Sequence, residues 1–235
     1  MAIACASESA GICCGDYAGQ LVEGQSFLCM SLAPETVNIV AEQLLVPSLF
    51  IYDLHLPVSS VEMYPAVRRL ITTESLEPVV PRSLRFMTVG GEQLTAFHKP
   101  TTPFQPIALY EDIMEPALGV GLAVQSWLNG WNPQASSCPP QSQYNSLNIR
   151  HVYIREALRG WPSTCDHAKW ALGIPDPSIP SAYGTSAVCL SDMNRMLGQL
   201  VRGGGAVCFT GRPALWQSFR SIIDAVEECS LRLQA

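Results

Sequence analysis

Long apolar runs are scarce in this chain of 235 residues, and a cationic, apolar leader is missing from its start. No hydrophobic stretch reaches the roughly 18 to 20 residues that a membrane-spanning helix needs, so we expect no membrane partner. Residues 1–15 hold alanines, serines, cysteines and Glu8, without a basic segment or a sustained apolar core, which excludes a secretory signal there. We therefore expect an internal start, as a truncated gene model or a duplicated fragment would give.

Charge is also sparse, and it is unevenly placed. Charged residues make up 14% of the chain and the net charge is −6, which argues against a general binder of polyanions. Residues 150–220 differ, because they hold eight basic residues against four acidic ones, a net charge of +4. A local positive field of this kind suits a phosphodiester and weakens as salt rises. The alternative is that about half of these arginines form surface ion pairs.

Cysteine patterns typical of zinc sites are absent as well. The chain has nine cysteines but no Cys-x-x-Cys pair and no series of Cys and His suited to zinc, so we expect no metal site. This number of cysteines is high for a cytosolic protein. It indicates disulfides that form in an oxidising compartment.

The chain does contain 48% hydrophobic residues, enough for the core of one domain or of two closely packed lobes. Its 18 prolines and 17 glycines predict frequent breaks, as in a mixed α/β chain with long loops. We expect helices over 61–71 and 108–118 and a loop over 131–144. Hydrophobic runs predict strands over 49–56, 84–89, 120–127, 148–154, 169–172 and 187–190.

Two segments repeat the same order of features. Residues 24–29 precede Pro34 and an amphipathic stretch, and residues 204–208 precede Pro213 and a helix that we expect to reach about Glu227. Each segment predicts a strand, a short loop and a helix with proline in its first turn. The repeat predicts two related lobes.

The helix after Pro213 has apolar residues at helical spacing. We therefore assign Trp216 to packing. The stripe expected to be buried consists of Leu215, Phe219, Ile222 and Val226.

One short motif carries chemistry, the His-x-Lys pair of His167 and Lys169. Residues two apart in an extended strand point to the same face, so the imidazole and the ammonium would lie side by side. Lysine can then neutralise a phosphate oxygen while histidine attacks phosphorus or transfers a proton. Taken alone, such a pair more often marks a solvated edge. The adjacent His98 and Lys99 would point to opposite faces and are rejected as a second pair, and His55 and His151 are assigned structural roles.

An ordered series of motifs surrounds this pair. Residues 166–170 read Asp-His-Ala-Lys-Trp, and residues 191–195 read Ser-Asp-Met-Asn-Arg. Residues 202–205 then read Arg-Gly-Gly-Gly, and residues 213–216 read Pro-Ala-Leu-Trp. The series resembles the C-terminal catalytic half of deoxyribonuclease II, an acid nuclease related to the phospholipase D superfamily. Weaker similarity through residues 24–29 and 110–127 extends the resemblance over most of the chain.

The resemblance implies roles for individual residues. His167 and Lys169 would be catalytic, together with Asp192, which could fix the tautomer of an imidazole. The alternative for Asp192 is a turn or a helix N-cap, and the proline-rich segment 171–185 looks longer than in the family. Asn194 and Arg195 would contact phosphate or the scaffold. Arg202 would bind substrate, and Gly203 to Gly205 would allow close approach of the backbone.

The resemblance also implies a reaction without metal or cofactor. One histidine attacks phosphorus, a second protonates the departing 5′ oxygen, and water releases a 3′-phosphate end. An acidic optimum follows, because one imidazole must start protonated. The family has two His-x-Lys motifs in two related halves, and only the second is found in this chain.

Three hypotheses follow for the partner and the activity. The first is a partial acid endonuclease whose substrate is DNA. The second is a site completed in a homodimer, and the third is an inactive protein that binds DNA. A structural or protein-binding secreted domain is a further alternative. The resemblance places the protein in the lysosome or outside the cell.

The resemblance finally implies a fold and a set of disulfides. We expect a phospholipase D-like α+β fold, a mixed sheet flanked by helices. Residues 1–75 would be the remnant of a first lobe and residues 76–235 the second lobe. The implied disulfides are Cys189 with Cys208 and Cys138 with Cys229.

Overall fold

The fold is built on one mixed β-sheet, seen in a computed structural model that describes residues 2–3, 26, 28–47, 58–72, 80–175 and 186–229. The nine strands follow the order β11-β6-β5-β8-β9-β10-β4-β3, with β7 added beside β6. Only β5 and β6 are parallel among the paired strands of this sheet. The expected α+β class with a mixed sheet is confirmed. The strands are β3 (Arg82–Met87), β4 (Gln93–Lys99), β5 (Gly121–Gln125), β6 (Ser146–Ile154), β7 (Arg159–Pro162), β8 (Trp170–Ile174), β9 (Val188–Ser191), β10 (Gly204–Phe209) and β11 (Ile223–Val226).

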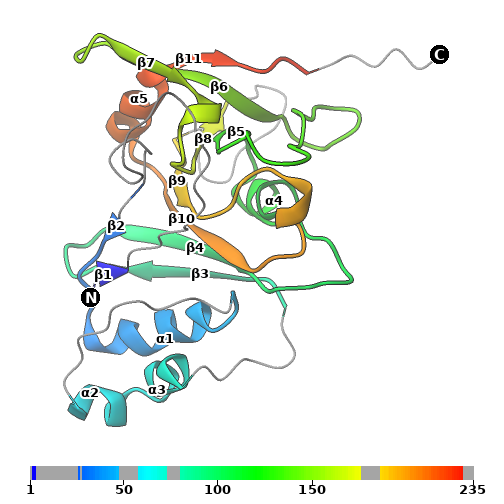
Figure 1. The fold of residues 1–235 in the computed structure, drawn as a ribbon. Helices are drawn as coiled ribbons and strands as arrows, with labels where there is room; N and C mark the ends of the chain where they lie inside the picture. Colours follow the sequence, from blue (N-terminus) through cyan, green and yellow to red (C-terminus); the bar gives the residue numbers. More distant parts are fainter. Residues whose placement is uncertain are drawn as a thin grey trace, which may run out of the picture.

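Helices cover both faces of this sheet (Figure 1). Because side chains alternate between faces along a strand, Ala96 and Phe97 of β4 enter two different hydrophobic clusters. Ala96 packs with α1 (Pro34–Leu44) and α3 (Pro65–Ile71), which lie below β3 and β4 in the figure. Phe97 packs with the π-helix η2 (Leu109–Met114) and α4 (Glu115–Leu118). The remaining elements are β1 (Ala2–Ile3), β2 (Leu28–Cys29), α2 (Val58–Met63), α5 (Pro213–Ile222) and the short 3-10 turns η3 (Ser163–Cys165) and η4 (Leu197–Gln199).

Most of the expected elements are present with small shifts. The predicted helix over 61–71 is divided at Tyr64 into α2 and α3, because Pro65 has no amide hydrogen for the preceding turn. The predicted helix over 108–118 consists of η2 and α4 and ends at Gly119, whose φ of 67° is left-handed. The predicted strand over 49–56 lies outside the described residues.

The prediction of a helix to about Glu227 was wrong. Helix α5 ends at Ile222, and Ile223–Val226 forms β11 on the edge of β6. The β-branched residues at 222, 223 and 226 fit a strand, and β6 offers open backbone partners that helical spacing does not reveal. Leu215, Phe219 and Ile222 pack against the core as expected, but Val226 is 39% exposed.

Both expected disulfides are present. Cys189 and Cys208 lie opposite each other on β9 and β10, with their Cα atoms 4.0 Å apart. Cys138 and Cys229 join the loop after β5 to the segment after β11. Cys29 is exposed and forms no disulfide with another cysteine of the described residues. The second disulfide therefore fastens the end of β11 to the rest of the domain.

The division into lobes at residue 75 stays a prediction. Helices α1 and α3, which precede that point, share one hydrophobic cluster with β3 and β4, which follow it.

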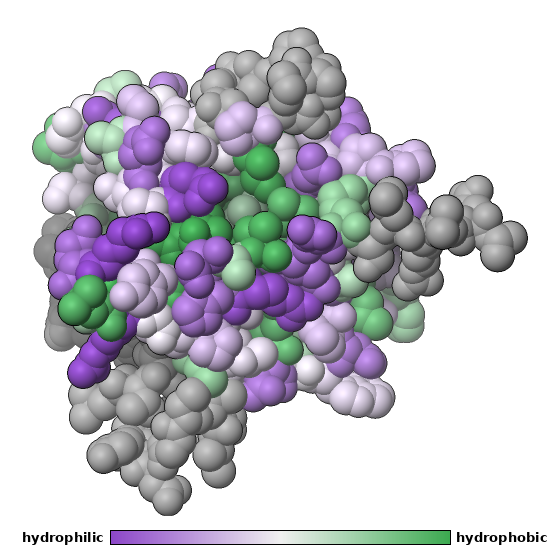
Figure 2. Space-filling view, turned by 90° about the horizontal axis from the view of Figure 1, so that it is seen from above, coloured by the Kyte–Doolittle hydropathy of each residue, from purple (hydrophilic) through white to green (hydrophobic). Residues whose placement is uncertain are grey.

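Figure 2 shows the end of the molecule that carries β7 and β11, where hydrophilic side chains surround an apolar patch. Within the described residues, every helix is too short or too polar to cross a membrane.

Candidate active site

The His-x-Lys pair lies in extended chain immediately before β8. The ammonium Nζ of Lys169 is 2.9 Å from Nδ1 of His167 and also donates to the carbonyl oxygen of His167. The two side chains are 3% and 4% exposed. The expected arrangement, side by side on one face, is confirmed. The catalytic role of the pair stays a prediction.

Trp127, two residues after the end of β5, packs against the imidazole from one side. Its ring centroid lies 5.5 Å from that of His167, and the planes are tilted by 53°. The indole Nε1 donates to the carbonyl oxygen of Thr164 at 3.1 Å, and the backbone N–H of Trp127 donates to Oδ1 of Asn194 at 3.0 Å. These bonds fix the tryptophan, which in turn limits the rotation of the histidine.

Asp166 shapes the turn that delivers the pair. Its Oδ1 accepts from the backbone N–H of Ala168 at 2.9 Å, and its Oδ2 accepts from Nε1 of Trp161 at 3.0 Å. Both oxygens of this buried carboxylate are therefore used to hold backbone and packing. The aspartate beside His167 in sequence is thus part of the support for the pair.

Asp192 follows β9 and interacts electrostatically with two lysines. Its Oδ1 accepts from the backbone N–H of Gly205 at 2.8 Å, a bond across to β10. Burial raises the pKa of this carboxyl, whereas the Gly205 bond and the positive charges of Lys169 and Lys99 lower it. The alternative of a helix N-cap was wrong, because η4 begins only after Met196. The proposed action on an imidazole stays a prediction.

The two residues after Met193 are bound into the scaffold. Arg195 is 1% exposed, and its guanidinium donates to Oε1 of Glu111 and to Oδ1 of Asn148. Asn194 holds Trp127, as described above. These contacts match the scaffold alternative stated for both residues. Arg202 is exposed in the turn before β10, and its contact with substrate is untested.

The glycine run allows close approach of protein backbone. A Cβ on Gly205 would lie 2.5 Å from the carbonyl oxygen of Phe97, and one on Gly203 would lie 2.3 Å from that of Pro47. A side chain at Gly205 would push β10 away from β4, and one at Gly203 would clash with the segment after α1. The run therefore keeps Asp192 within reach of the Gly205 N–H.

Sequence reasoning missed the role of Lys99. This side chain is fully buried, and its Nζ donates to the carbonyl oxygens of Gln199 and Leu200 at 3.0 and 2.9 Å. Burial lowers its pKa to about 8, against the opposing charges of Asp192 and Asp112. Two lysines from distant parts of the chain thus act on one aspartate, which only the pairing of β4 with β10 makes possible.

His98 points to the other face of β4, as the rejection of the His98-Lys99 pair assumed. Its backbone lies opposite that of Gly205 on β10, and burial lowers the pKa of its imidazole to about 4. A histidine with such a pKa stays neutral across the range in which an unperturbed imidazole titrates. The side chains of His98 and Lys99 therefore do not form a pair.

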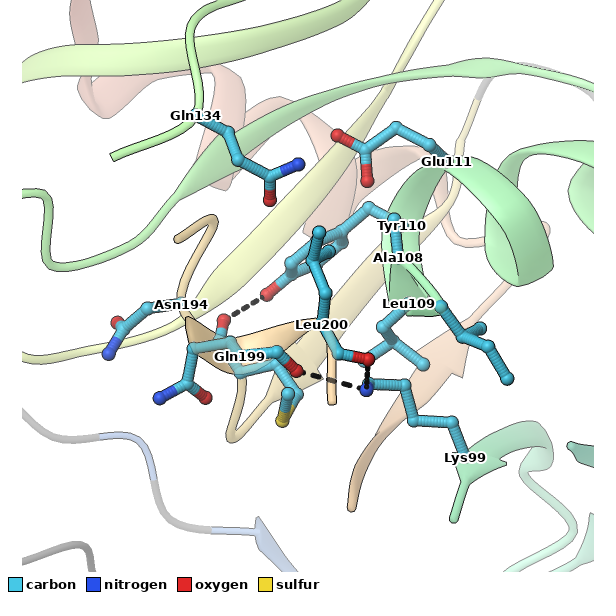
Figure 3. Close-up of a pocket in the computed structure, with 11 residues that line it drawn as sticks. Lys99, Ala108, Leu109, Tyr110, Glu111, Gln134, Asn194, Gln199 and Leu200 are labelled. Carbon is cyan, nitrogen blue, oxygen red and sulfur yellow. Dashed lines mark hydrogen bonds between the residues drawn. The ribbon is translucent and has the colours of Figure 1, made fainter. Parts of the chain in front are cut away.

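A very small, largely apolar pocket of about 10 Å³ lies between η2 and the segment after β9 (Figure 3). Asn194 belongs to its wall and also contacts Trp127, whereas His167 and Lys169 do not line it. Tyr110, which lines the pocket, donates to the carbonyl oxygen of Met193 at 2.6 Å, and burial raises the pKa of this phenol. The pocket is thus separate from the pair, and Asn194 and Trp127 connect the two. The side chains labelled around it include Lys99, Glu111, Gln134, Asn194 and Gln199.

The arrangement can position an imidazole for proton transfer or attack. An ammonium that donates to Nδ1 leaves the proton of a neutral ring on Nε2. Nε2 could give a proton to a leaving oxygen from the doubly protonated ring, or it could attack phosphorus from the neutral tautomer whose proton is on Nδ1. Within the described residues no three His, Cys, Asp or Glu side chains converge into a metal site.

Comparison with known proteins gives a consistent result. The family model described as Deoxyribonuclease II matches residues 17–229. Cell-death-related nuclease 7 of Caenorhabditis elegans is 30% identical over 88% of this chain and 53% of its own length. A putative deoxyribonuclease-2 of Burkholderia pseudomallei is 29% identical over 83% of this chain and 52% of its own. Deoxyribonuclease-2-alpha of Rattus norvegicus is 28% identical over 88% and 55%. The chain spans about half the length of these curated relatives.

Proposed function

This chain belongs to the deoxyribonuclease II family, and from that premise we propose that its site serves an acid endonuclease that hydrolyses DNA phosphodiesters. The observation that carries the proposal is the contact of Lys169 Nζ with His167 Nδ1 at 2.9 Å, inside a family match over 17–229. A buried cation beside an imidazole is suited to a phosphate, since it balances charge on oxygen while the ring reacts.

The proposed reaction has two displacement steps. Nε2 of one histidine forms a bond to phosphorus, the bond from phosphorus to the 5′ oxygen breaks, and a second histidine gives that oxygen its proton. Water then attacks the phosphohistidine, which frees the ring and leaves a 3′-phosphate. His167 can take either part. Neither step uses a metal or a cofactor.

The proposed reaction needs a second histidine, and the given sequence has no second His-x-Lys motif to provide it. His167 is in the only His-x-Lys pair of the chain. We propose that another copy of the chain could provide it in a homodimer of the phospholipase D-like kind. A preparation that is strictly monomeric and still cleaves DNA would contradict the dimer.

A second candidate is a homologue that binds DNA without cleaving it. The given sequence holds one His-x-Lys pair, and a protein with this pair alone would supply half of the reacting groups. It would keep the positive charge of residues 150–220, so its binding should weaken steeply with salt. We propose a lysosomal or secreted location for either candidate, which the two disulfides support.

One titration separates the two candidates. Plasmid DNA is added to the homogeneous chain at low salt and about pH 5, with chelator present, and binding and strand breaks are followed together. Breaks support the nuclease, whereas binding without breaks supports the inactive homologue. If neither occurs, both candidates are wrong for this chain.

A further inference from the structure

The indole of Trp131 is exposed to solvent at a turn that backbone hydrogen bonds hold in place. It is 87% exposed, although tryptophan is among the residues that folding usually buries. The chain after it is held against residues 195–197. Leu197 N donates to the carbonyl oxygen of Asn132 at 3.1 Å, and Gln134 N donates to that of Arg195 at 2.9 Å. The exposed ring therefore stands on a fixed turn.

The backbone of this turn is specialised. Asn132 has a φ of 55°, a left-handed conformation that asparagine tolerates better than most residues. On the other side of Trp131, a Cβ on Gly130 would lie 2.0 Å from Cε of Met196 and 3.5 Å from Cζ3 of Trp127. The turn is thus packed closely against the tryptophan that contacts His167.

Trp131 lies within reach of a strand bound at His167. Trp127 and Trp131 are four residues apart, so at most about 14 Å separates their Cα atoms. The Trp127 ring is 5.5 Å from the His167 ring. One nucleotide advances a strand of duplex DNA by about 3.4 Å, so the indole is a few nucleotides from a phosphate at the histidine.

The charge of the surrounding chain suits a polyanion. Residues 116–155 and 193–223 contain no aspartate or glutamate, although the whole chain carries a net charge of −6. Both segments that form the turn and its support belong to these stretches. The exposed Arg202 adds a positive charge to the second stretch. A phosphodiester could therefore pass Trp131 without meeting carboxylates from either segment.

We propose that Trp131 is a stacking platform for a nucleobase of the DNA strand held at His167. The proposal rests on the proposed function for its ligand, but it does not depend on cleavage. Every base has a flat face, so such a ring binds DNA with little sequence preference.

Fluorescence anisotropy of labelled oligothymidylate tests the proposal at low salt and neutral pH. Trp131→Ala should weaken binding roughly 5- to 150-fold, the effect of losing one base stacked on an aromatic ring, and Trp131→Phe should recover most of it. Leu158→Ala is the matched control, because Leu158 is 80% exposed in the turn between β6 and β7. It should bind as the unaltered chain does.

An oligomer of the same length with abasic sugars gives the sharper comparison. Trp131→Ala and the unaltered chain should bind it equally, since no base is present to stack. Equal loss on both oligomers, or no loss on either, would overturn the proposal. A dimer that dissociates in Trp131→Ala with unchanged affinity for oligothymidylate would assign the ring to a protein interface and also overturn it. If the binding results support stacking but the chain does not cleave DNA, only the proposed nuclease activity is contradicted.

Discussion

Lys169 holds the imidazole of His167 through Nδ1, at 2.9 Å, in a position where both side chains are almost completely buried. The sequence interpretation had given Asp192 the role of fixing the tautomer of an imidazole, and that role stays a prediction. Burial raises the pKa of the Asp192 carboxyl, and the positive charges of Lys169 and Lys99 oppose this effect. Lys169 therefore contacts the imidazole and also interacts electrostatically with Asp192.

Replacing Lys169 by methionine tests the role of this lysine in the site. The substitution keeps an unbranched side chain but removes the ammonium that donates to Nδ1 and balances phosphate charge. If the chain cleaves DNA, we expect kcat/KM to fall by about 100-fold or more, the usual loss when one group that stabilises developing charge is removed. Initial rates on plasmid DNA measure this, with far-UV circular dichroism as the control for folding. A rate within a factor of about two of the unaltered chain would contradict the role of the lysine.

Arg195 should matter for stability more than for binding. Its guanidinium is buried on Glu111 and Asn148, so Arg195→Met would leave the Glu111 carboxylate without its counter-charge. We expect the free energy of unfolding to fall by about 3–5 kcal/mol, and the double variant with Glu111→Gln to be less destabilised than the single one. Urea titration of Arg195→Met, Glu111→Gln and the double variant measures the coupling between the two side chains. Stable Arg195→Met protein with weakened DNA binding would instead support the phosphate contact.

Glu115 should make the fold more stable in acid. Burial raises its pKa to about 8, and Ser146 is its hydrogen-bond partner, at 2.6 Å from Oε1. Because the unfolded pKa is near 4.5, the folded chain binds more protons between about pH 4.5 and 8. The contribution of Glu115 to the free energy of unfolding is therefore largest below about pH 4.5 and is lost as pH rises toward 8.

The variant Glu115→Gln should flatten this dependence. Thermal unfolding across that pH range measures it, and His151→Gln serves as a comparison because His151 lies at the surface beside Asp224. His98, whose pKa is lowered to about 4, contributes the opposite slope below about pH 6.5 in both proteins. The difference between Glu115→Gln and the unaltered chain isolates the glutamate. Identical slopes would show that Glu115 does not titrate in this range.

Local rules were sufficient for the His-x-Lys pair and for most strands. The alternation of side chains in extended chain predicted that His167 and Lys169 share a face, and it predicted that His98 and Lys99 do not. Periodicity failed at Ile223–Val226, because the choice between helix and strand there depends on the free edge of β6. The sequence offered no sign of that edge.

Contacts between distant segments were beyond such rules. Arg195 is a basic residue in a positively charged stretch, which suggested phosphate, but Glu111 and Asn148 enclose it once β5, β6 and η2 have assembled. Lys99 reaches Asp192 only because β4 and β10 pair. Trp131 was assigned to a loop from its composition, and its exposure follows from how residues 132–134 pair with 195–197.

The most direct test of the central claim compares His167→Ala with His151→Ala in DNA cleavage at about pH 5, by homogeneous protein with chelator present. His167 belongs to the buried pair, whereas His151 is an accessible histidine on β6 that is bonded to Asp224. We predict that the unaltered chain and His151→Ala release fragments with 3′-phosphate ends, and that His167→Ala releases none. Equal cleavage by both variants, or fragments with 5′-phosphate ends, would contradict a deoxyribonuclease II site centred on His167.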